Sequence, residues 1–191
     1  MPLVPFDERP VDVAFSGSLG NSPEEARQRV PTQKLRARRA VFAALDRVAE
    51  ELPELTVHAN RYLSFHWARD RAEGYSPLMA STKVALCPRG SVWETYRFWE
   101  ALASGCVVVG ERLPKRAYYQ GAPVLTIDRW SRLPGVLRHL FADRSAMRER
   151  AEASLRYWRA HGAPPAVAEV IAARLDPTRS APRSPSPDDV S

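Results

Sequence analysis

The chain has 191 residues, 45% of them hydrophobic, which fits one domain with short appendages and a buried core. Its 28 lysines and arginines exceed its 22 acidic residues, and the formal net charge at pH 7 is +6. The sequence contains no signal peptide and no apolar run of about 20 residues, so we expect a cytoplasmic protein without a transmembrane segment.

The excess of basic residues is mostly arginine, which favours an anionic partner such as a phosphate, a nucleotide or a nucleic acid. The two cysteines, Cys87 and Cys106, are expected to be buried thiols in a reducing compartment. His, Cys, Asp and Glu residues nowhere show the spacing of a zinc site, and no Asp-x-Asp pair is present to hold a metal–diphosphate. The sequence therefore predicts neither a bound metal nor a cofactor.

Residues 1–10 form a Pro-rich lead-in, and the apolar segment 11–15 is predicted to be the first strand. The following segment, 16–21, contains two glycines and two serines, as expected for a turn. Because the spacing of Gly17 and Gly20 does not match the dinucleotide fingerprint, a surface turn is favoured over a phosphate-binding loop.

A long helix over 31–52 is predicted next, because apolar residues recur in it at helical spacing. Arg36, Arg38 and Arg39 lie near its start, where they form either a solvated basic face or a donor that reaches a phosphate across a cleft. A short strand over 55–58 follows.

Residues 59–74 show no clean periodicity, and we interpret them as a loop or irregular helix. His58 and His66 lie near the expected cleft, but single histidines are more often structural hydrogen-bonding residues than catalysts. Residues 75–80 are predicted to form a short helix that leads into the central part of the chain.

The central part is predicted to be a βαβ unit, with a right-handed crossover. Buried strands are expected over 83–87 and 106–109, and a helix over 94–104 joins them after the break at 88–91. Gly105 stands where the end of a helix requires a residue that adopts positive φ. Ligands of such sheets bind beyond the carboxyl ends of the strands.

The loops at that edge carry groups suited to a diphosphate. The first N–H groups of the helix are unpaired and carry a partial positive charge, Thr95 can add a hydroxyl, and Arg89 or Arg97 can add a charged donor. Residues 110–114 form a second loop at the same edge.

The C-terminal part is predicted to contain a last strand and three helices. The strand covers 123–127, and the helices cover 131–142, 144–161 and 164–175. Residues 176–191 are rich in Pro and Ser, and we expect them to be a disordered tail.

The residues of the central unit resemble a known family. Exostosin-like glycosyltransferases carry in their donor-binding half a C-P-R-G loop, a short S/T-Y-R-x-W-E-A helix and a G-C-x-P-V strand. Similar runs here are C-P-R-G at 87–90, T-Y-R-F-W-E-A at 95–101 and G-C-V-V-V at 105–109. More broadly, the chain resembles the C-terminal nucleotide-sugar domain of GT-B transferases, most strongly over 75–115.

The resemblance implies a Rossmann-like three-layer α/β/α domain with a parallel sheet, half of a GT-B fold, over residues 11–175. It further implies a transferase of the hexosyltransferase type that takes a nucleotide-diphosphate sugar as its donor. Catalysis would not need a metal, because arginines and a helix N-terminus would stabilise the departing diphosphate.

We assign the donor-binding candidates from the site chemistry and the resemblance together. Glu100 matches a glutamate that binds the ribose hydroxyls in the resembled family, and an ion pair with a nearby arginine is the alternative for it. No catalytic residue is assigned. The candidates for the donor phosphates are Arg36, Arg39, Arg89, Thr95, Tyr96 and Arg97, with Gly17 and Ser18 shaping the floor of the cleft.

The chain departs from complete GT-B enzymes in two ways. Retaining members usually have an acid eight positions before the ribose glutamate, and Val92 stands there, which favours an inverting type. In addition, no acceptor domain precedes residue 11. The chain is therefore a fragment, or works with a separate acceptor-binding chain, or binds a nucleotide sugar without transferring it.

Two further functions are carried as hypotheses. The first is a non-catalytic accessory module that completes a transferase by pairing with an acceptor-domain chain. The second is nucleic-acid binding, which is disfavoured because basic residues alternate with acidic ones and no RNA- or DNA-binding signature is present.

Overall fold

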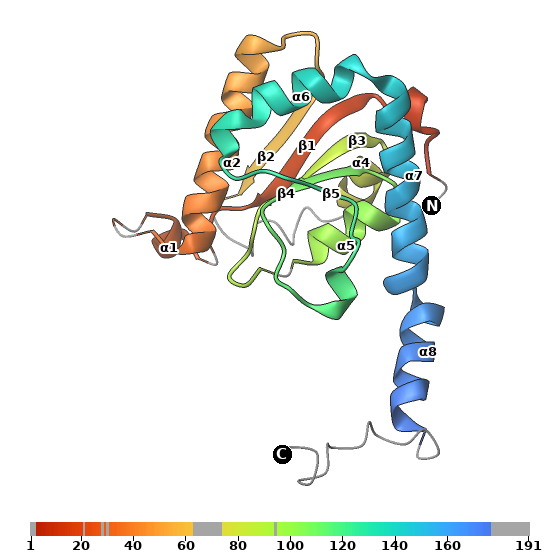
Figure 1. Cartoon of the computed structure of the whole chain (residues 1–191). Coiled ribbons are helices and arrows are strands. Elements are labelled where there is room, and N and C mark those ends of the chain that lie inside the picture. Colours follow the sequence, from red (N-terminus) through yellow and green to blue (C-terminus); the bar gives the residue numbers. More distant parts are fainter. Residues whose placement is uncertain are drawn as a thin grey trace, which may run out of the picture.

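The computed structural model describes residues 3–20, 22–27, 29, 31–62, 74–93 and 95–176. In these residues the chain forms an α/β domain in which helices cover both faces of one parallel sheet (Figure 1). The strand order is β2-β1-β3-β4-β5. The bounds are β1 Val11–Ser18, β2 Val57–Tyr62, β3 Thr82–Cys87, β4 Val107–Gly110 and β5 Val124–Thr126. The predicted Rossmann-like fold class is confirmed.

The helices occupy most of the remaining described chain. They are α1 Pro23–Arg27, α2 Gln33–Glu51, α4 Tyr75–Ala80, α5 Tyr96–Ala103, α6 Leu133–Ala142, α7 Arg144–His161 and α8 Pro164–Leu175. Short 3-10 turns are η1 Phe6–Glu8, η3 Ala117–Tyr119 and η4 Trp130–Arg132. The three predicted C-terminal helices and the helix over 75–80 are thus present.

The sheet is buried on both faces, as expected for parallel strands. In β4, Val107 and Val109 belong to the core on one face, whereas Val108 belongs to the core on the other. Helices α2 and α6 pack on the first face, and α5 packs on the second. Helix α7 contributes to both, because Met147 joins the first core and Tyr157 the second. The result is three layers, α/β/α.

The predicted βαβ unit is β3-α5-β4, and its two strands are parallel neighbours. Val84 pairs with Val107 and Cys87 pairs with Gly110. Gly105 follows α5 with φ of +62°, as predicted for the residue after the helix end. A Cβ atom at Gly105 would also lie 2.9 Å from the Cγ atom of Leu155, so both conformation and space require glycine there.

The two cysteines are free and buried, as predicted, and lie at opposite ends of this unit. Burial raises the pKa of the Cys87 thiol and of the Cys106 thiol to about 12. Both thiols therefore stay protonated and unreactive at neutral pH.

The first half of the chain differs from the sequence-based prediction in its strands. Strand β1 continues to Ser18, so residues 16–18, predicted to be part of a turn, belong to the strand and pair with β2. Strand β2 begins at Val57 and runs into the segment predicted to be a loop. The reason is that β2 is an edge strand with alternate residues exposed, which tolerates polar residues. Residues 63–73 lie outside the described residues.

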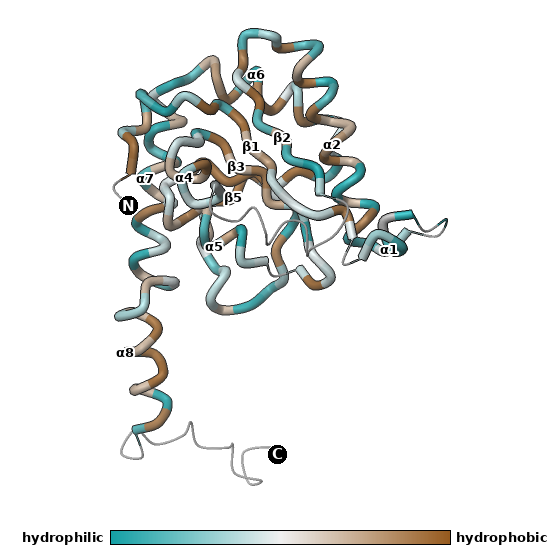
Figure 2. The backbone as a smooth tube through the Cα atoms, turned by 180° about the vertical axis from the view of Figure 1, so that it is seen from behind, coloured by the Kyte–Doolittle hydropathy of each residue, from teal (hydrophilic) through white to brown (hydrophobic). Residues whose placement is uncertain are grey.

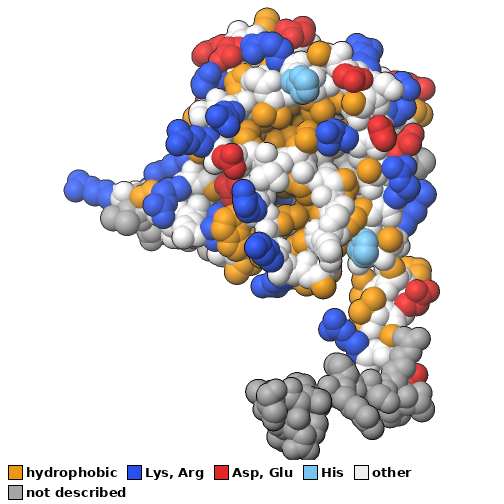
Figure 3. Space-filling model, in the orientation of Figure 1, with side chains coloured by type: hydrophobic (Ala, Val, Ile, Leu, Met, Phe, Trp, Pro, Cys, Tyr) orange, Lys and Arg blue, Asp and Glu red, His pale blue; other side chains and the backbone are white. Residues whose placement is uncertain are grey.

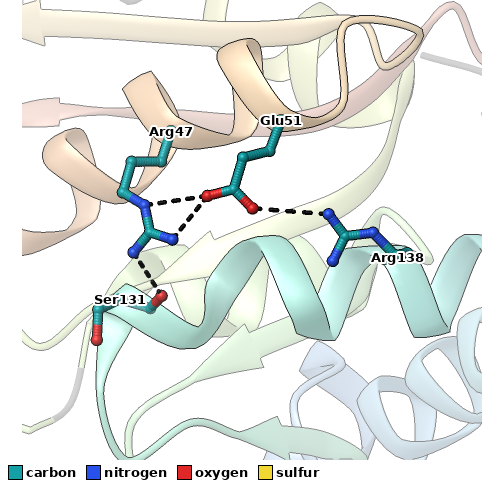
Figure 4. Close-up of polar contacts among 4 residues, drawn as sticks. All are labelled: Arg47, Glu51, Ser131 and Arg138. Carbon is teal, nitrogen blue, oxygen red and sulfur yellow. Dashed lines mark hydrogen bonds and ion pairs between the residues drawn. The ribbon is translucent and has the colours of Figure 1, made fainter.

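Helix α2 begins two residues later than predicted. The hydroxyl of Thr32 accepts a hydrogen bond of 3.2 Å from the backbone N–H of Leu35 and so caps the helix. Near its other end α2 is joined to α6 by charged groups (Figure 4). Arg47 contacts the carboxylate of Glu51 at 2.6 Å and the backbone oxygen of Ser131, in η4, at 3.1 Å. Arg138 of α6 contacts the other carboxylate oxygen of Glu51 at 3.6 Å and so joins the two helices.

The lead-in before β1 is tied to the domain by one arginine. Arg9 is 4% exposed, and its guanidinium donates hydrogen bonds of 2.8–2.9 Å to the backbone oxygens of Thr82, Ser104 and Gly105. Thr82 is the first residue of β3, and Ser104 and Gly105 precede β4, so Arg9 joins the lead-in to the βαβ unit at the amino-terminal edge of the sheet.

Hydrophobic residues are concentrated in the sheet and again along α8, which extends away from the rest of the domain (Figures 1 and 2). None of the helices in the described part of the chain is both long and apolar enough to cross a membrane.

Candidate functional site

The carboxyl ends of the strands place several predicted site residues at one edge of the sheet. β1 ends at Ser18, β3 at Cys87 and β4 at Gly110. The loops that follow β3 and β4 carry arginines, and the first turns of α2 and α5 lie beside them. The candidate site is built from these segments.

Three cations form a basic cluster at the end of β1, which we define as Lys34, Arg38 and Arg97. Lys34 is 5% exposed and Arg38 is 7% exposed, although both are charged residues of α2. Arg38 donates from Nη1 to the backbone oxygen of Ser18 and, at 3.1 Å, to its hydroxyl. Arg97 reaches the same region from the first turn of α5 and donates to the backbone oxygen of Ser16.

Burial and like charges perturb the titration of this cluster. Burial, together with the charges of Arg38 and Arg97, lowers the pKa of Lys34 to about 8. Burial and the charge of Arg97 lower the pKa of Arg38 to about 10. The carboxylate of Glu25, on α1, opposes both effects. Cations held close together in this way favour an anion as a further neighbour.

The basic cluster also contains buried donors without a partner. The Nε atoms of Arg38 and Arg97 are buried and have no hydrogen-bond partner among the described residues, and the same holds for Nε of Arg89. Buried polar atoms are nearly always paired in proteins, so unpaired donors at one edge of a sheet indicate a place for a ligand.

Gly17 fits this site for a steric reason. The guanidinium carbon of Arg97 lies 4.9 Å from the centre of the Phe15 ring. A Cβ atom at Gly17 would approach Nη2 of Arg97 to 2.8 Å, so a larger residue there would displace the guanidinium. Gly17 thus lies against Arg97, and Ser18 against Arg38, so both residues adjoin the basic cluster.

Beside the basic cluster is a cavity of about 600 Å³, which we call the arginine cleft. It opens between the start of α2 and the loops after β3, β4 and β5. Its lining includes Arg36, Arg89, Arg112 and Arg129, the acids Glu111 and Asp128, and the indoles of Trp93 and Trp130. Figure 3 shows basic side chains around this part of the surface.

Glu111 organises the wall of the arginine cleft. One of its carboxylate oxygens accepts a 3.0 Å hydrogen bond from Nε1 of Trp130, and the other accepts a 3.4 Å bond from the backbone N–H of Arg89. The Arg89 guanidinium lies over the ring of Trp93, with 4.0 Å between its carbon and the ring centre. Two loops and η4 are therefore held together around the side chain of Arg89.

The remaining predicted residues are distributed around this edge. Thr95 is the N-cap residue of α5, and its side chain makes no capping hydrogen bond among the described residues. Tyr96 is 88% exposed. Arg36 lines the arginine cleft, whereas Arg39 is exposed and is not one of the residues that line it.

Glu100 is placed apart from the arginine cleft. It is exposed on α5, and its charge acts on the buried hydroxyl of Tyr75 from α4. Burial, and to a smaller extent Glu100, raise the pKa of Tyr75 despite the opposing charge of Arg97. The structure therefore brings Arg97 and Glu100 near one tyrosine, but does not bring Glu100 to the side chain of Arg89.

Five residues at this edge are not among the candidates predicted from the sequence: Lys34, Arg38, Trp93, Glu111 and Trp130. A signal for the first two is present in the sequence. Lys34 and Arg38 fall at helical spacing with the buried residues Val41 and Leu45, on the apolar side of α2. Charged residues on an apolar stripe are candidates for a functional site.

The comparisons with known proteins bear on the fold. No protein-family model matches the chain, and no curated protein matches it. Among solved structures, a chain in the crystal structure of the GtfA/B complex is similar, with a TM-score of 0.50 and 15% sequence identity. The alignment covers 81% of this chain and 33% of that chain, so this chain spans about a third of the length of the structure it matches. The likeness shows a shared fold.

Proposed function

We propose that this domain binds the nucleotide-diphosphate sugar of an exostosin-like, inverting glycosyltransferase of the GT-B type. The observation that carries the proposal is the gathering of buried, incompletely paired cations at the carboxyl edge of a Rossmann-like sheet. This is the edge at which such sheets bind nucleotides. The fold likeness to a chain of the GtfA/B complex supports the assignment to the glycosyltransferase class.

In this proposal the basic cluster binds the diphosphate. Arg97 and Arg38 present Nε donors, and Lys34 adds a third positive charge, so the two phosphates supply negative charge beyond that of Glu25. The N–H groups in the first turn of α5 are further donors. A divalent ion is not required for the charge balance, because three cations face the two or three negative charges of a nucleoside diphosphate.

The same groups would assist the chemistry. An acceptor hydroxyl attacks the anomeric carbon on the face opposite the diphosphate, and the bond from that carbon to the phosphate oxygen breaks. The electron pair of that bond stays on the diphosphate, where the basic cluster stabilises the increased charge. The acceptor proton leaves to a general base that we do not assign to this chain.

Glu100 remains our candidate for the ribose hydroxyls. Its exposure on α5 leaves its carboxylate available, and its charge and that of Arg97 both act on Tyr75. A Glu100→Ala variant is expected to lose affinity for nucleotides but to keep its affinity for inorganic diphosphate, which has no ribose.

The direct test is calorimetric titration with UDP, GDP and ADP, in the presence of a chelator. We expect one nucleotide to bind with micromolar affinity, and Arg97→Met to weaken it at least about tenfold, as for loss of a charged hydrogen bond. Arg156→Met, an exposed arginine of α7, is the matched control. Binding of none of the nucleotides, or an affinity equal in Arg97→Met and the control, would contradict the proposal.

The accessory module is the second candidate, because the chain spans about a third of the matched chain and that chain belongs to a complex. It predicts nucleotide binding by this chain without turnover, and turnover once a chain with an acceptor domain is added. Release of free sugar from a bound nucleotide sugar by the isolated chain would argue against it.

A further inference from the structure

Helix α8 exposes an apolar surface that nothing in the described structure covers. Its large apolar side chains are exposed by 40% at Val167, 55% at Val170, 52% at Ile171 and 75% at Leu175. None of its twelve residues is buried. A helix of this length is marginal in water without tertiary packing, and a helix with so few charged residues is usually buried.

A second uncovered apolar surface lies elsewhere on the domain, away from α8. It is a groove of about 660 Å³ between the edge strand β5, helix α6 and the first turns of α7, which we call the edge groove. Figure 3 shows hydrophobic side chains gathered beside α6 and bordered by charged ones. Apolar lining residues are Leu125, Val136, Leu140 and Ala146, and charged or titratable ones are Arg132, His139, Asp143 and Arg150.

The α8 helix does not occupy the edge groove of its own chain. The groove contacts α7 at Ala146 and Arg150, whereas α8 follows the other end of α7, after His161. Arg150 and His161 are eleven positions apart in α7, a distance of about 16 Å along the helix, and α8 continues away from the domain (Figure 1). The helix is therefore placed to meet another molecule.

We propose that α8 lies in the edge groove of a second copy of this chain, and that the second copy returns the same contact. One such exchange would cover both uncovered apolar surfaces of each copy and would close as a two-fold dimer. A single twelve-residue helix in a groove buries less surface than a standard interface, which buries about 1,600 Å². The reciprocal arrangement forms the contact twice and so doubles the buried area.

The charges of the two surfaces are compatible with this exchange. The rim of the edge groove carries Arg132, Arg150 and His139 around one acid, Asp143. Helix α8 offers one charge of each sign, Glu169 and Arg174. Opposite partners are therefore available for both charged residues of α8, and neither surface carries a large excess of charge that would oppose their contact.

Sedimentation of the purified chain over a range of concentrations tests the proposal. We expect a concentration-dependent dimer, and monomers for Ile171→Asp on α8 and for Val136→Asp in the groove. Leu3→Asp, the same change at an exposed apolar residue outside both surfaces, should still dimerise. A monomeric wild type, or a dimer that survives Ile171→Asp, would overturn the proposal.

Cysteine cross-linking distinguishes the exchange from other placements of α8. It also avoids placing a charge in an apolar surface, which could unfold the chain. Ile171→Cys and Val136→Cys chains, mixed and oxidised, are expected to form a disulfide-linked pair, while Cys87 and Cys106 stay buried. A cross-link in the Ile171→Cys chain alone would indicate α8 against α8. A link within a single doubly substituted chain would indicate that α8 folds back. Either result would contradict the exchange.

Discussion

Charge repulsion inside the basic cluster is the residue-scale feature that links stability to binding. Arg38 and Lys34 lie on the buried side of α2, where the rest of the helix contributes apolar residues to the core. Their pKa values are lowered, so the folded domain holds these protons less tightly than the unfolded chain does. A bound anion would remove that penalty, and we therefore expect the free domain to be destabilised by its own site.

Replacing Lys34 by methionine tests this trade-off. Because the folded-state pKa of Lys34, about 8, is below its ordinary value of 10.5, the wild-type free energy of unfolding should rise as pH increases from about 8 to 10.5. The variant should lose this rise and be more stable at neutral pH by about 1–3 kcal/mol. Urea unfolding at several pH values measures both effects, and Lys115→Met, an exposed lysine, is the control.

The same titration predicts how binding depends on pH. The bound diphosphate favours charged Lys34, so the affinity for the nucleotide should be nearly constant below about pH 8 and should fall above it, by up to about tenfold per pH unit. Calorimetry below and above this value, with wild type and Lys34→Met, gives the comparison. A wild-type affinity that falls no more steeply than that of the variant would remove Lys34 from the site.

Arg89 is expected to contribute from the neighbouring loop. Its backbone is held by Glu111 and its guanidinium by Trp93, while its Nε is buried without a partner among the described residues. Arg89→Ala should weaken nucleotide binding about tenfold, as for a charge-assisted hydrogen bond, with little change in stability. An affinity unchanged within error would remove the role of Arg89 in donor binding.

At the scale of elements, the sequence was most informative where the hydrophobic pattern was strong. The apolar runs of β3 and β4, with a helix and Gly105 between them, correctly predicted the βαβ unit. The edge strand β2 was misplaced, because its residues at 57–62 are half polar and their pairing with β1 is not visible in local composition. The extension of β1 to Ser18 was missed for the same reason.

The site was only partly predictable for a physical reason. Motif and loop chemistry selected Arg89 and Arg97 as candidates, and both lie at the carboxyl edge of the sheet. Glu111 could not be assigned, because its role depends on the approach of Trp130 from a distant segment of the chain. Such a contact is fixed by tertiary packing and leaves no local pattern.

A stability prediction concerns Gly105, which lies between the end of α5 and the start of β4. Gly105→Ala should lower the free energy of unfolding by about 2–4 kcal/mol, because it strains a positive φ and brings a methyl group against Leu155. Gly121 shares the positive φ but has open space around a Cβ atom. Gly121→Ala should therefore lower the free energy of unfolding by only about 1 kcal/mol. Chemical denaturation of both variants separates the effect of the contact with Leu155 from the strain of the positive φ.

A second stability prediction concerns Arg9, which joins the lead-in to the βαβ unit. Arg9→Met leaves four backbone oxygens without their charged donor and should lower the free energy of unfolding by about 3 kcal/mol. Arg148→Met removes an exposed ion pair with Asp7 in the same region and should cost at most about 1 kcal/mol. Equal losses in the two variants would show that Arg9 contributes no more than a surface residue.

For the whole molecule, the two edges of the sheet contrast. At the amino-terminal edge the charges are paired internally, as with Asp12, which contacts Lys83 at 2.8 Å and accepts a hydrogen bond from the backbone of Thr56. At the carboxyl edge cations outnumber acids and retain unpaired donors. Anions are therefore attracted mainly to the carboxyl edge of the sheet, although acidic and basic side chains alternate over the surface shown in Figure 3.

This distribution predicts how the protein distinguishes a nucleotide from a nucleic acid. A nucleic acid is attracted by many exposed charges, so any binding of a single-stranded oligonucleotide should be weak and should fall steeply as salt is raised from about 0.05 to 0.2 M. A diphosphate at the basic cluster contacts buried cations, which salt screens less, so UDP or its equivalent should lose less than about threefold over the same range. Parallel fluorescence titrations measure the two slopes. Tight oligonucleotide binding at the higher salt, or a nucleotide affinity that falls as steeply as that of the oligonucleotide, would mean that surface charge rather than the buried cluster governs recognition.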